Sequence, residues 1–150
     1  MACTSDLAQH GSRIPAPMTP SEAFASICLA AVGCDRRLDK EEAKMLRSQL
    51  KCLAPFNQQS EQEMALLFDR LLSELRQLGW SALITAAVPS LTAMQQETVL
   101  AVAAHLMRAD GDVTPLEEAF LDELASQLML APERCAQILG VIALLHRNPL

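Results

Sequence analysis

The feature that most constrains this chain is a signature of helix starts that recurs along it. At five places a Ser, Thr or Asp is followed three residues later by Glu or Gln. In this pattern each of the two side chains accepts a hydrogen bond from the backbone N–H of the other residue, which satisfies donors at the start of a helix. The five pairs are Thr19/Glu22, Asp39/Glu42, Ser60/Glu63, Thr92/Gln95 and Thr114/Glu117.

Proline positions and apolar spacing agree with these starts. Pro20 and Pro115 fall at the first helical position, where a missing N–H costs nothing, and Pro89 ends a short segment. Helices are predicted over residues 20–34, 40–52, 61–78, 80–88, 93–109, 115–129 and 132–146. Within 61–78 one apolar stripe is expected to hold Leu66, Leu67, Phe68, Leu71, Leu72, Leu75 and Leu78.

The composition favours helices and excludes a β-sandwich or barrel. Hydrophobic residues make up 51% of the 150 residues, but aromatic residues only 3%. Since aromatic and β-branched residues favour strands, their scarcity indicates an all-α chain. We expect one all-α domain of about seven helices over residues 19–150, with residues 1–18 as a flexible leader.

Charge and cysteine usage narrow the class of protein. The formal net charge is −6, whereas a nucleic-acid-binding protein usually has a basic surface, so nucleic acid is not expected as a partner. The longest stretch without charge, residues 77–96, contains Gly79 and Pro89, so no stable membrane insertion is expected. Five cysteines without a C-x-x-C pair favour neither a zinc ribbon nor a disulfide framework, and Cys28 is expected to act as a small hydrophobe. We therefore expect a reduced, cytoplasmic protein.

An internal repeat is visible when the sequence is shifted by 75 positions. The shift predicts two pseudo-symmetric helix-loop-helix units that bury their apolar faces against each other. Identical residues then stand opposite each other at Glu22/Glu97, Asp35/Asp110, Glu42/Glu117 and Leu46/Leu121, and similar ones at Ile27/Val102, Leu38/Val113 and Met45/Phe120.

The loop of the second unit carries a candidate metal site. Asp110 and Asp112 project from the loop, Glu117 reaches back from the first helical turn, and Gly111 permits the bend. Seven acidic residues and no Lys or Arg lie between positions 109 and 133. Oxygen ligands of this kind suit a hard divalent cation such as Ca²⁺ or Mg²⁺.

The loop of the first unit is a weaker candidate. It keeps three carboxylates, but three cations stand among them and could neutralise them internally. The carboxylates are Asp35, Asp39 and Glu42, and the cations are Arg36, Arg37 and Lys40.

Helix capping is the alternative explanation of both loops. The Thr114/Glu117 and Asp39/Glu42 pairs are capping boxes, and early carboxylates favour the positive end of a helix dipole. Capping does not explain the presence of Asp112 or the absence of Lys and Arg around the second loop.

At these loops the sequence resembles the TerB family of tellurite-resistance proteins and TerB-like domains. The resemblance covers about residues 20–145 and rests on EAFASICLAAVGCDRRLDKEEAKML and on QQETVLAVAAHLMRADGDVTPLEEAFLDELASQL. It implies an all-helical fold of seven helices and a divalent-metal site at both helix-loop-helix joints. Carried over by position, that site is Asp110, Asp112, Glu117, Asp35, Asp39 and Glu42. Arg36 and Arg37 stand where the second unit has Gly111 and Asp112, which places the first half-site in doubt.

Two functional classes follow from this resemblance. In the first, the chain is a non-enzymatic adaptor that binds a divalent metal and a protein partner and is linked to tellurite and stress resistance. In the second, it is a metal-independent helical module for protein–protein interaction, similar to TerB domains of co-chaperones, with an apolar groove for its partner. Hydrolysis by paired carboxylates ranks last, because no substrate-binding motif accompanies them. His105 is expected to be packed or solvated and not a ligand. The sequence does not define an oligomeric state.

Overall fold

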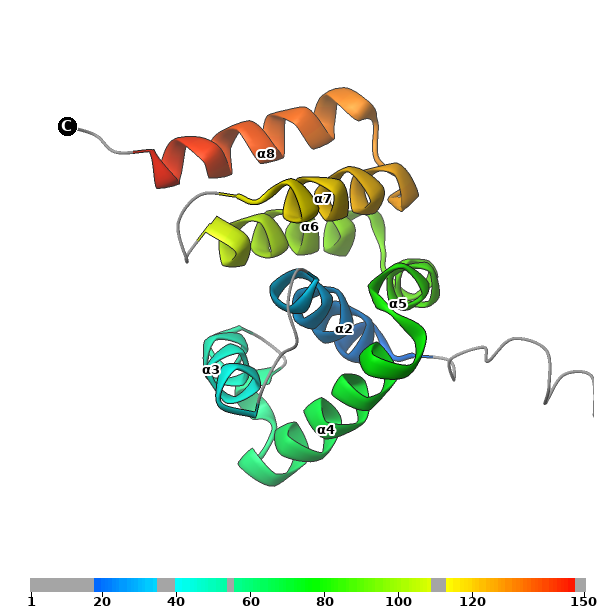
Figure 1. The fold of residues 1–150 in the computed structure, drawn as a ribbon, viewed down its shortest axis with the longest axis vertical. Coiled ribbons are helices and arrows are strands. Elements are labelled where there is room, and N and C mark those ends of the chain that lie inside the picture. The colour runs from blue at the N-terminus through cyan, green and yellow to red at the C-terminus, as the bar shows by residue number, and fades with distance from the viewer. Residues whose placement is uncertain (1–17, 35–39, 54–55, 109–112, 148–150) are drawn as a thin grey trace, which may run out of the picture.

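A computed structural model describes residues 18–34, 40–53, 56–108 and 113–147, without the side chains of Lys40 and Glu42. Within these residues the chain forms seven α-helices, two short 3₁₀-helices and no strand (Figure 1). The α-helices are α2 (Pro20–Gly33), α3 (Lys40–Leu50), α4 (Glu61–Leu78), α5 (Trp80–Ala87), α6 (Ala93–Arg108), α7 (Pro115–Gln127) and α8 (Pro132–His146). The 3₁₀-helices are η1 (Phe56–Gln58) and η2 (Val88–Ser90). The predicted all-α fold of seven helices is confirmed, and each boundary lies within about two residues of its expected position.

The helix starts follow the capping signature. In the box of α6, the Thr92 N–H donates to Gln95 Oε1 at 2.8 Å and the Gln95 N–H donates to Thr92 Oγ1 at 3.2 Å. The same reciprocal pair begins α2, α4 and α7. The fifth predicted box needs Asp39 and the side chain of Glu42, which lie outside the described residues. Four predicted boxes are therefore confirmed.

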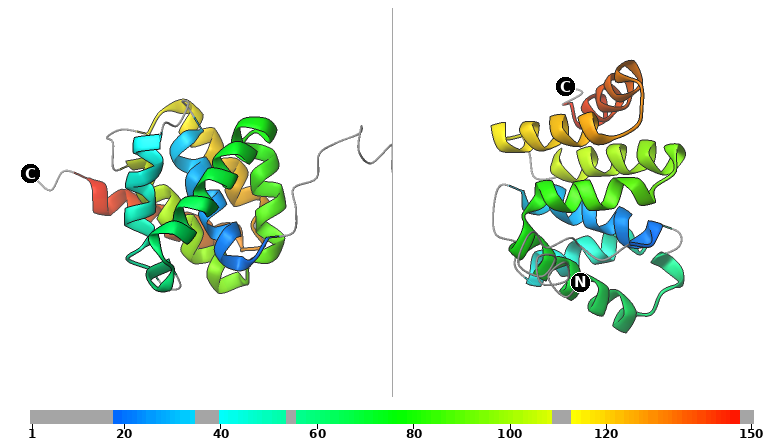
Figure 2. Two further views of the ribbon diagram at one scale, coloured as in Figure 1. Left: turned by 90° about the horizontal axis from the view of Figure 1, so that it is seen from below. Right: turned by 90° about the vertical axis from the view of Figure 1, so that its right-hand side faces the viewer.

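The core is organised around α2, which lies in the middle of the fold. It contacts α3, α4, α5, α6 and α7. In both views of Figure 2, as in Figure 1, α2 runs through the interior with other helices on several sides. Ala23 and every residue from Ala25 to Ala31 are completely inaccessible to solvent. A helix that is apolar on all sides is stable only when it is surrounded, as α2 is.

The apolar stripe of α4 differs from its prediction at one residue. Leu66 is 65% exposed and does not face the core, whereas Met64, which the predicted stripe omits, is fully buried. Since each residue turns a helix by about 100°, Leu66 lies on the side opposite Met64, and the buried face continues through Phe68 and Leu71.

The predicted internal repeat matches the helix boundaries but not every side chain. The ends of α2 and α6 are 75 positions apart (33 and 108), as are the starts of α3 and α7 (40 and 115). Met45, however, is 66% exposed, whereas its counterpart Phe120 is fully buried with its ring 5.2 Å from that of Trp80. The pseudo-symmetric repeat therefore stays a prediction.

A buried amide joins α6 to the turn between α7 and α8. The side chain of Gln96 donates from Nε2 to the carbonyl oxygen of Leu91 at 3.1 Å and accepts from the Met129 N–H at 2.8 Å. Gln96 and Leu91 are buried, so the Leu91 carbonyl would otherwise lack this partner in a region shielded from water. Gln96 therefore fixes where α8 begins relative to α6.

The packing of α2 gives a first prediction. Ala30→Leu adds three carbon atoms where no space exists, so we expect the free energy of unfolding to fall by about 1–3 kcal/mol or more. Ala119→Leu, on the exposed side of α7, is the matched control and is expected to change it by less than about 0.5 kcal/mol. Urea denaturation followed by circular dichroism measures both, and equal stability of the two variants would contradict the central position of α2.

The buried amide gives a second prediction. Gln96→Leu keeps the approximate volume but leaves the Met129 N–H and the Leu91 carbonyl without this partner, so we expect a loss of about 1–3 kcal/mol in stability. The control is Gln62→Leu on the exposed surface of α4, measured by the same denaturation. An unchanged midpoint for Gln96→Leu would show that the bridge is not needed.

Candidate functional site

The joint between α6 and α7 contains the one predicted metal ligand whose side chain is described. Glu117 stands in the first turn of α7 and accepts a hydrogen bond at Oε1 from the Thr114 N–H, at 2.9 Å. Its own N–H donates to Thr114 Oγ1 at 3.2 Å. Only 8% of Glu117 is exposed, so this carboxylate is held in place and largely shielded from water.

The hydrogen bonding of Glu117 uses one of its two carboxylate oxygens. Among the described residues no donor bonds to the second oxygen, Oε2. A carboxylate offers about four lone-pair positions, so this atom keeps capacity for a further partner. The capping box thus accounts for part of the chemistry of Glu117.

The acidic residues of α7 are not neutralised by the described cations. Glu118 and Asp122 are exposed, and Glu123 accepts a hydrogen bond from Ser81 of α5 at 2.6 Å. The ion pairs between described residues lie elsewhere, at Lys51–Glu61, Arg70–Glu22 and Arg134–Glu97. Negative charge therefore accumulates along the start of α7, as the sequence predicts.

The remaining predicted ligands cannot be placed together. Asp35, Asp39, Asp110 and Asp112 lie outside the described residues, and so does the side chain of Glu42, although its backbone belongs to α3. Within the part of the chain that is described, no three His, Cys, Asp or Glu side chains are grouped as a metal site would need. The six-residue metal site therefore stays a prediction.

The helices that lead into the two predicted loops end on the same side of the molecule. The C-terminal ends of α2 and α6 point to the same side in Figure 1 and in the right panel of Figure 2. These two helices also contact each other extensively. A metal site built from both joints, which the family resemblance implies, requires this arrangement.

His105 has a partner that sequence reasoning missed. Its Nδ1 lies 2.8 Å from Nε2 of His146, and the ring centroids are 4.8 Å apart. The two residues are 41 positions apart and carry no shared motif, so only the packing of α8 on α6 reveals the pair. The contact links the last turn of α8 to α6.

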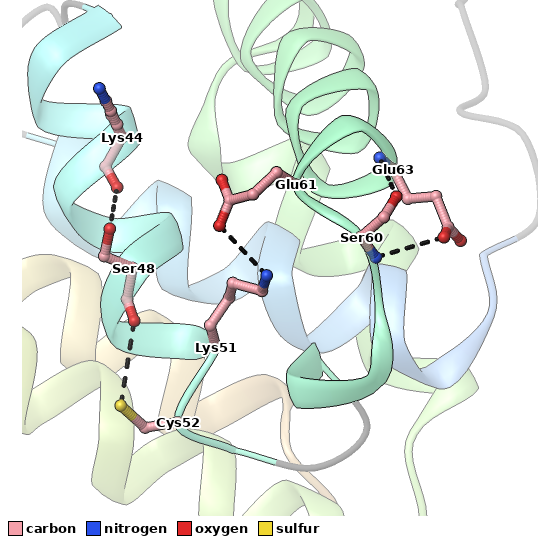
Figure 3. Close-up of polar contacts among 7 residues, drawn as sticks. All are labelled: Lys44, Ser48, Lys51, Cys52, Ser60, Glu61 and Glu63. Atoms are coloured by element: carbon pink, nitrogen blue, oxygen red, sulfur yellow. Dashed lines mark hydrogen bonds and ion pairs between the residues drawn. The ribbon is translucent and has the colours of Figure 1, made fainter.

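The connection between α3 and α4 is fixed by polar contacts (Figure 3). The Lys51 ammonium lies 3.1 Å from Glu61 Oε1, and its hydrogen bond and charge lower the pKa of that carboxyl. Next to this pair, the Ser60/Glu63 box begins α4. These contacts hold in position the segment that borders an apolar groove.

That groove is a second candidate site, with a volume of about 400 Å³. Its apolar lining comes from the start of α2, the α3–α4 connection and the start of α6, and includes Phe24, Leu53, Phe56, Leu91 and Met94. The groove is therefore at the N-terminal ends of α2 and α6, whereas the two joints follow their C-terminal ends. An apolar groove is what the interaction-module alternative expects.

The described cysteines give little support to thiol chemistry. Cys28, Cys34 and Cys135 are buried, and only Cys52 is exposed, next to the Ser48 carbonyl oxygen at 4.0 Å. Complete burial raises the pKa of the Cys28 thiol far above its ordinary value, because the thiolate would lose its hydration. The expectation that Cys28 acts as a small hydrophobe is confirmed.

The fold and the acidic helix start together define a small all-α domain with a capped, negatively charged helix-loop-helix joint. A family model described as "Tellurite resistance protein TerB" matches residues 21–139. The chain belongs to the TerB family, a family of tellurite-resistance-associated domains. Comparison with curated proteins and with solved structures found no match.

None of the described helices is both long enough and apolar enough to span a membrane.

The cysteine environments give a third prediction. In the folded protein at pH 8, iodoacetamide is expected to alkylate Cys52 and to leave Cys28 unmodified, because only the thiolate reacts and Cys28 is buried with a raised pKa. Peptide mass spectrometry after a timed reaction measures both sites. Unfolding in urea supplies the control, since both thiols should then react at similar rates, and rapid modification of Cys28 in the native protein would contradict the burial of α2.

Proposed function

We propose that this TerB-family chain is a non-enzymatic adaptor that binds a divalent cation at the α6–α7 joint. The observation that carries the proposal is the state of Glu117, which is buried and fixed by its cap yet keeps Oε2 without a described donor. Asp110 and Asp112 lie immediately before the cap in the sequence, so the chain can bring two more carboxylates to the same position. Oxygen ligands favour Ca²⁺ or Mg²⁺ over softer metals.

Metal binding would act on the charge of the joint. A bound cation would neutralise carboxylates that no described Lys or Arg pairs with, and would reduce the repulsion at the start of α7. A protein partner that contacts this joint would then meet a different charge in the metal-bound and the metal-free protein. The proposed setting is the reducing cytoplasm, where free thiols such as the four described ones persist.

The fourth prediction concerns metal binding by the chelator-treated protein. It is measured by titration calorimetry with Ca²⁺ and, in separate runs, with Mg²⁺, Mn²⁺ and Zn²⁺. We expect saturable heat for Ca²⁺ and a rise in melting temperature, because a ligand present at 100 times its Kd stabilises the folded state by about 2.7 kcal/mol. Glu117→Gln should abolish this binding without removing the cap, since Gln95 makes the same reciprocal hydrogen bonds at the start of α6.

The control for this titration is Glu118→Gln. It removes the same charge at the next residue of α7, which is exposed. We expect it to bind Ca²⁺ nearly as the wild type does. If Glu118→Gln and Glu117→Gln weaken binding equally, a diffuse negative surface and not a site holds the ion. Absence of both heat and stabilisation at millimolar ion would reject the metal-binding adaptor.

The groove of about 400 Å³ favours a second candidate, a metal-independent module for protein–protein interaction. Met94 lines this groove and is 79% exposed, so a partner seated in the groove would contact it. The two candidates differ in a measurable way. A partner that binds equally well with Ca²⁺ and with chelator, and is lost in Met94→Glu, would favour the interaction module.

A further inference from the structure

The outer side of α8 carries three exposed large apolar side chains and has no described element packed on it. Val141 is 56% exposed and Leu144 57% exposed, and Leu145 next to them is exposed as well. In Figure 1 and in the right panel of Figure 2, α8 forms one edge of the molecule with α6 and α7 on its inner side. Only Cys135 and Ile142 of this helix are buried. A neighbouring group of large apolar side chains on one helix face indicates a contact surface.

Gly140 is exposed on α8, one helical turn before Leu144. A Cβ added there would meet no atom within 4 Å, so packing against the rest of the molecule does not require glycine. Glycine inside a helix is less favourable than alanine because it loses more backbone entropy. A glycine one turn before the exposed Leu144 does, however, allow another helix to approach closely.

Two opposite charges stand symmetrically about Gly140. Glu133 is seven residues before it and Arg147 seven residues after it. Since seven residues are close to two helical turns, Glu133 and Gly140 lie on the same face of α8, and Arg147, the C-cap residue that directly follows the helix, continues that line. Neither Glu133 nor Arg147 forms an ion pair with any described residue, although Arg134, beside Glu133, pairs with Glu97. This line thus has an acidic residue at one end and a basic one at the other, with Gln137, Gly140 and Leu144 between them.

We propose that this face binds a second copy of the chain, with the two α8 helices antiparallel and crossing at Gly140. A two-fold axis at Gly140 places Glu133 of each copy opposite Arg147 of the other, which forms two equivalent ion pairs. The antiparallel arrangement also sets the N-terminal end of one helix dipole beside the C-terminal end of the other. A two-fold interface requires such a self-complementary surface, because the same patch of both copies is in contact and every contact between two different residues occurs twice.

The charge pattern selects a second copy over an unrelated partner. An unrelated helix could cover Val141 and Leu144, but it would not require equal spacing of opposite charges about a glycine. Both charged positions are also free of intrachain ion pairs among the described residues, so dimerisation breaks no existing pair.

The fifth prediction concerns this dimer and is tested by sedimentation velocity over a series of protein concentrations. Chelator is present in every run, so that metal binding does not contribute. The wild type is expected to approach twice its mass of 16.3 kDa as the concentration rises. Glu133→Arg and Arg147→Glu should each raise the dissociation constant by about tenfold or more, because like charges then face each other at both ends. The double variant Glu133→Arg/Arg147→Glu restores both pairs and should return to within about threefold of the wild type, since distant charge changes are otherwise additive.

A control and a second variant separate the interface from general effects. Asp69→Arg makes the same charge change on the exposed surface of α4 and should leave the dimer intact. Gly140→Leu should prevent association while the monomer stays folded, because the added side chain meets open space within its own chain. A mass that stays at 16.3 kDa at every concentration would overturn the proposal, and so would a double variant no better than the single ones.

Discussion

The fold depends on the burial of α2 on all of its sides. Its small residues let five other helices approach closely, and from Ala25 to Ala31 no surface is left that water could reach. Every other helix can then be amphipathic, with one face on α2 or its neighbours and one face in solvent. The buried aromatic rings, those of Phe56, Phe68 and Phe120, accordingly come from elements that surround α2 and not from its own buried stretch.

The helix boundaries could be predicted because capping is a local interaction. Four of the predicted boxes need only two side chains three residues apart, and the sequence contains both. The exposed position of Leu66 could also have been derived, since its angle to Met64 on the helix decides its face. The bridge made by Gln96 and the pair of His105 with His146 could not, because each joins segments more than 30 positions apart through packing alone.

Only part of the candidate metal site could be predicted from the sequence. Its acidic character and the cap of Glu117 follow directly from residue types and spacing, and the structure confirms the cap. The burial of that carboxylate was not predicted. Whether six carboxylates converge depends on loop conformations that no local rule determines. The groove at the other ends of α2 and α6 had no sequence signal beyond scattered apolar residues, since it is formed by three segments distant in the chain. The proposed metal joint and the groove are thus connected by two helices in contact, of which α6 is about 24 Å long.

The thin attachment of α8 has a consequence for the unfolding of the domain. This helix buries few side chains and is held mainly by its contact with α6, the Gln96 bridge at its start and the histidine pair at its end. Cooperative units with little buried apolar surface open at lower free energy than the core. Amide protons of α8 should therefore exchange through a partial opening that leaves α2 closed, so that the domain has two levels of protection and not one.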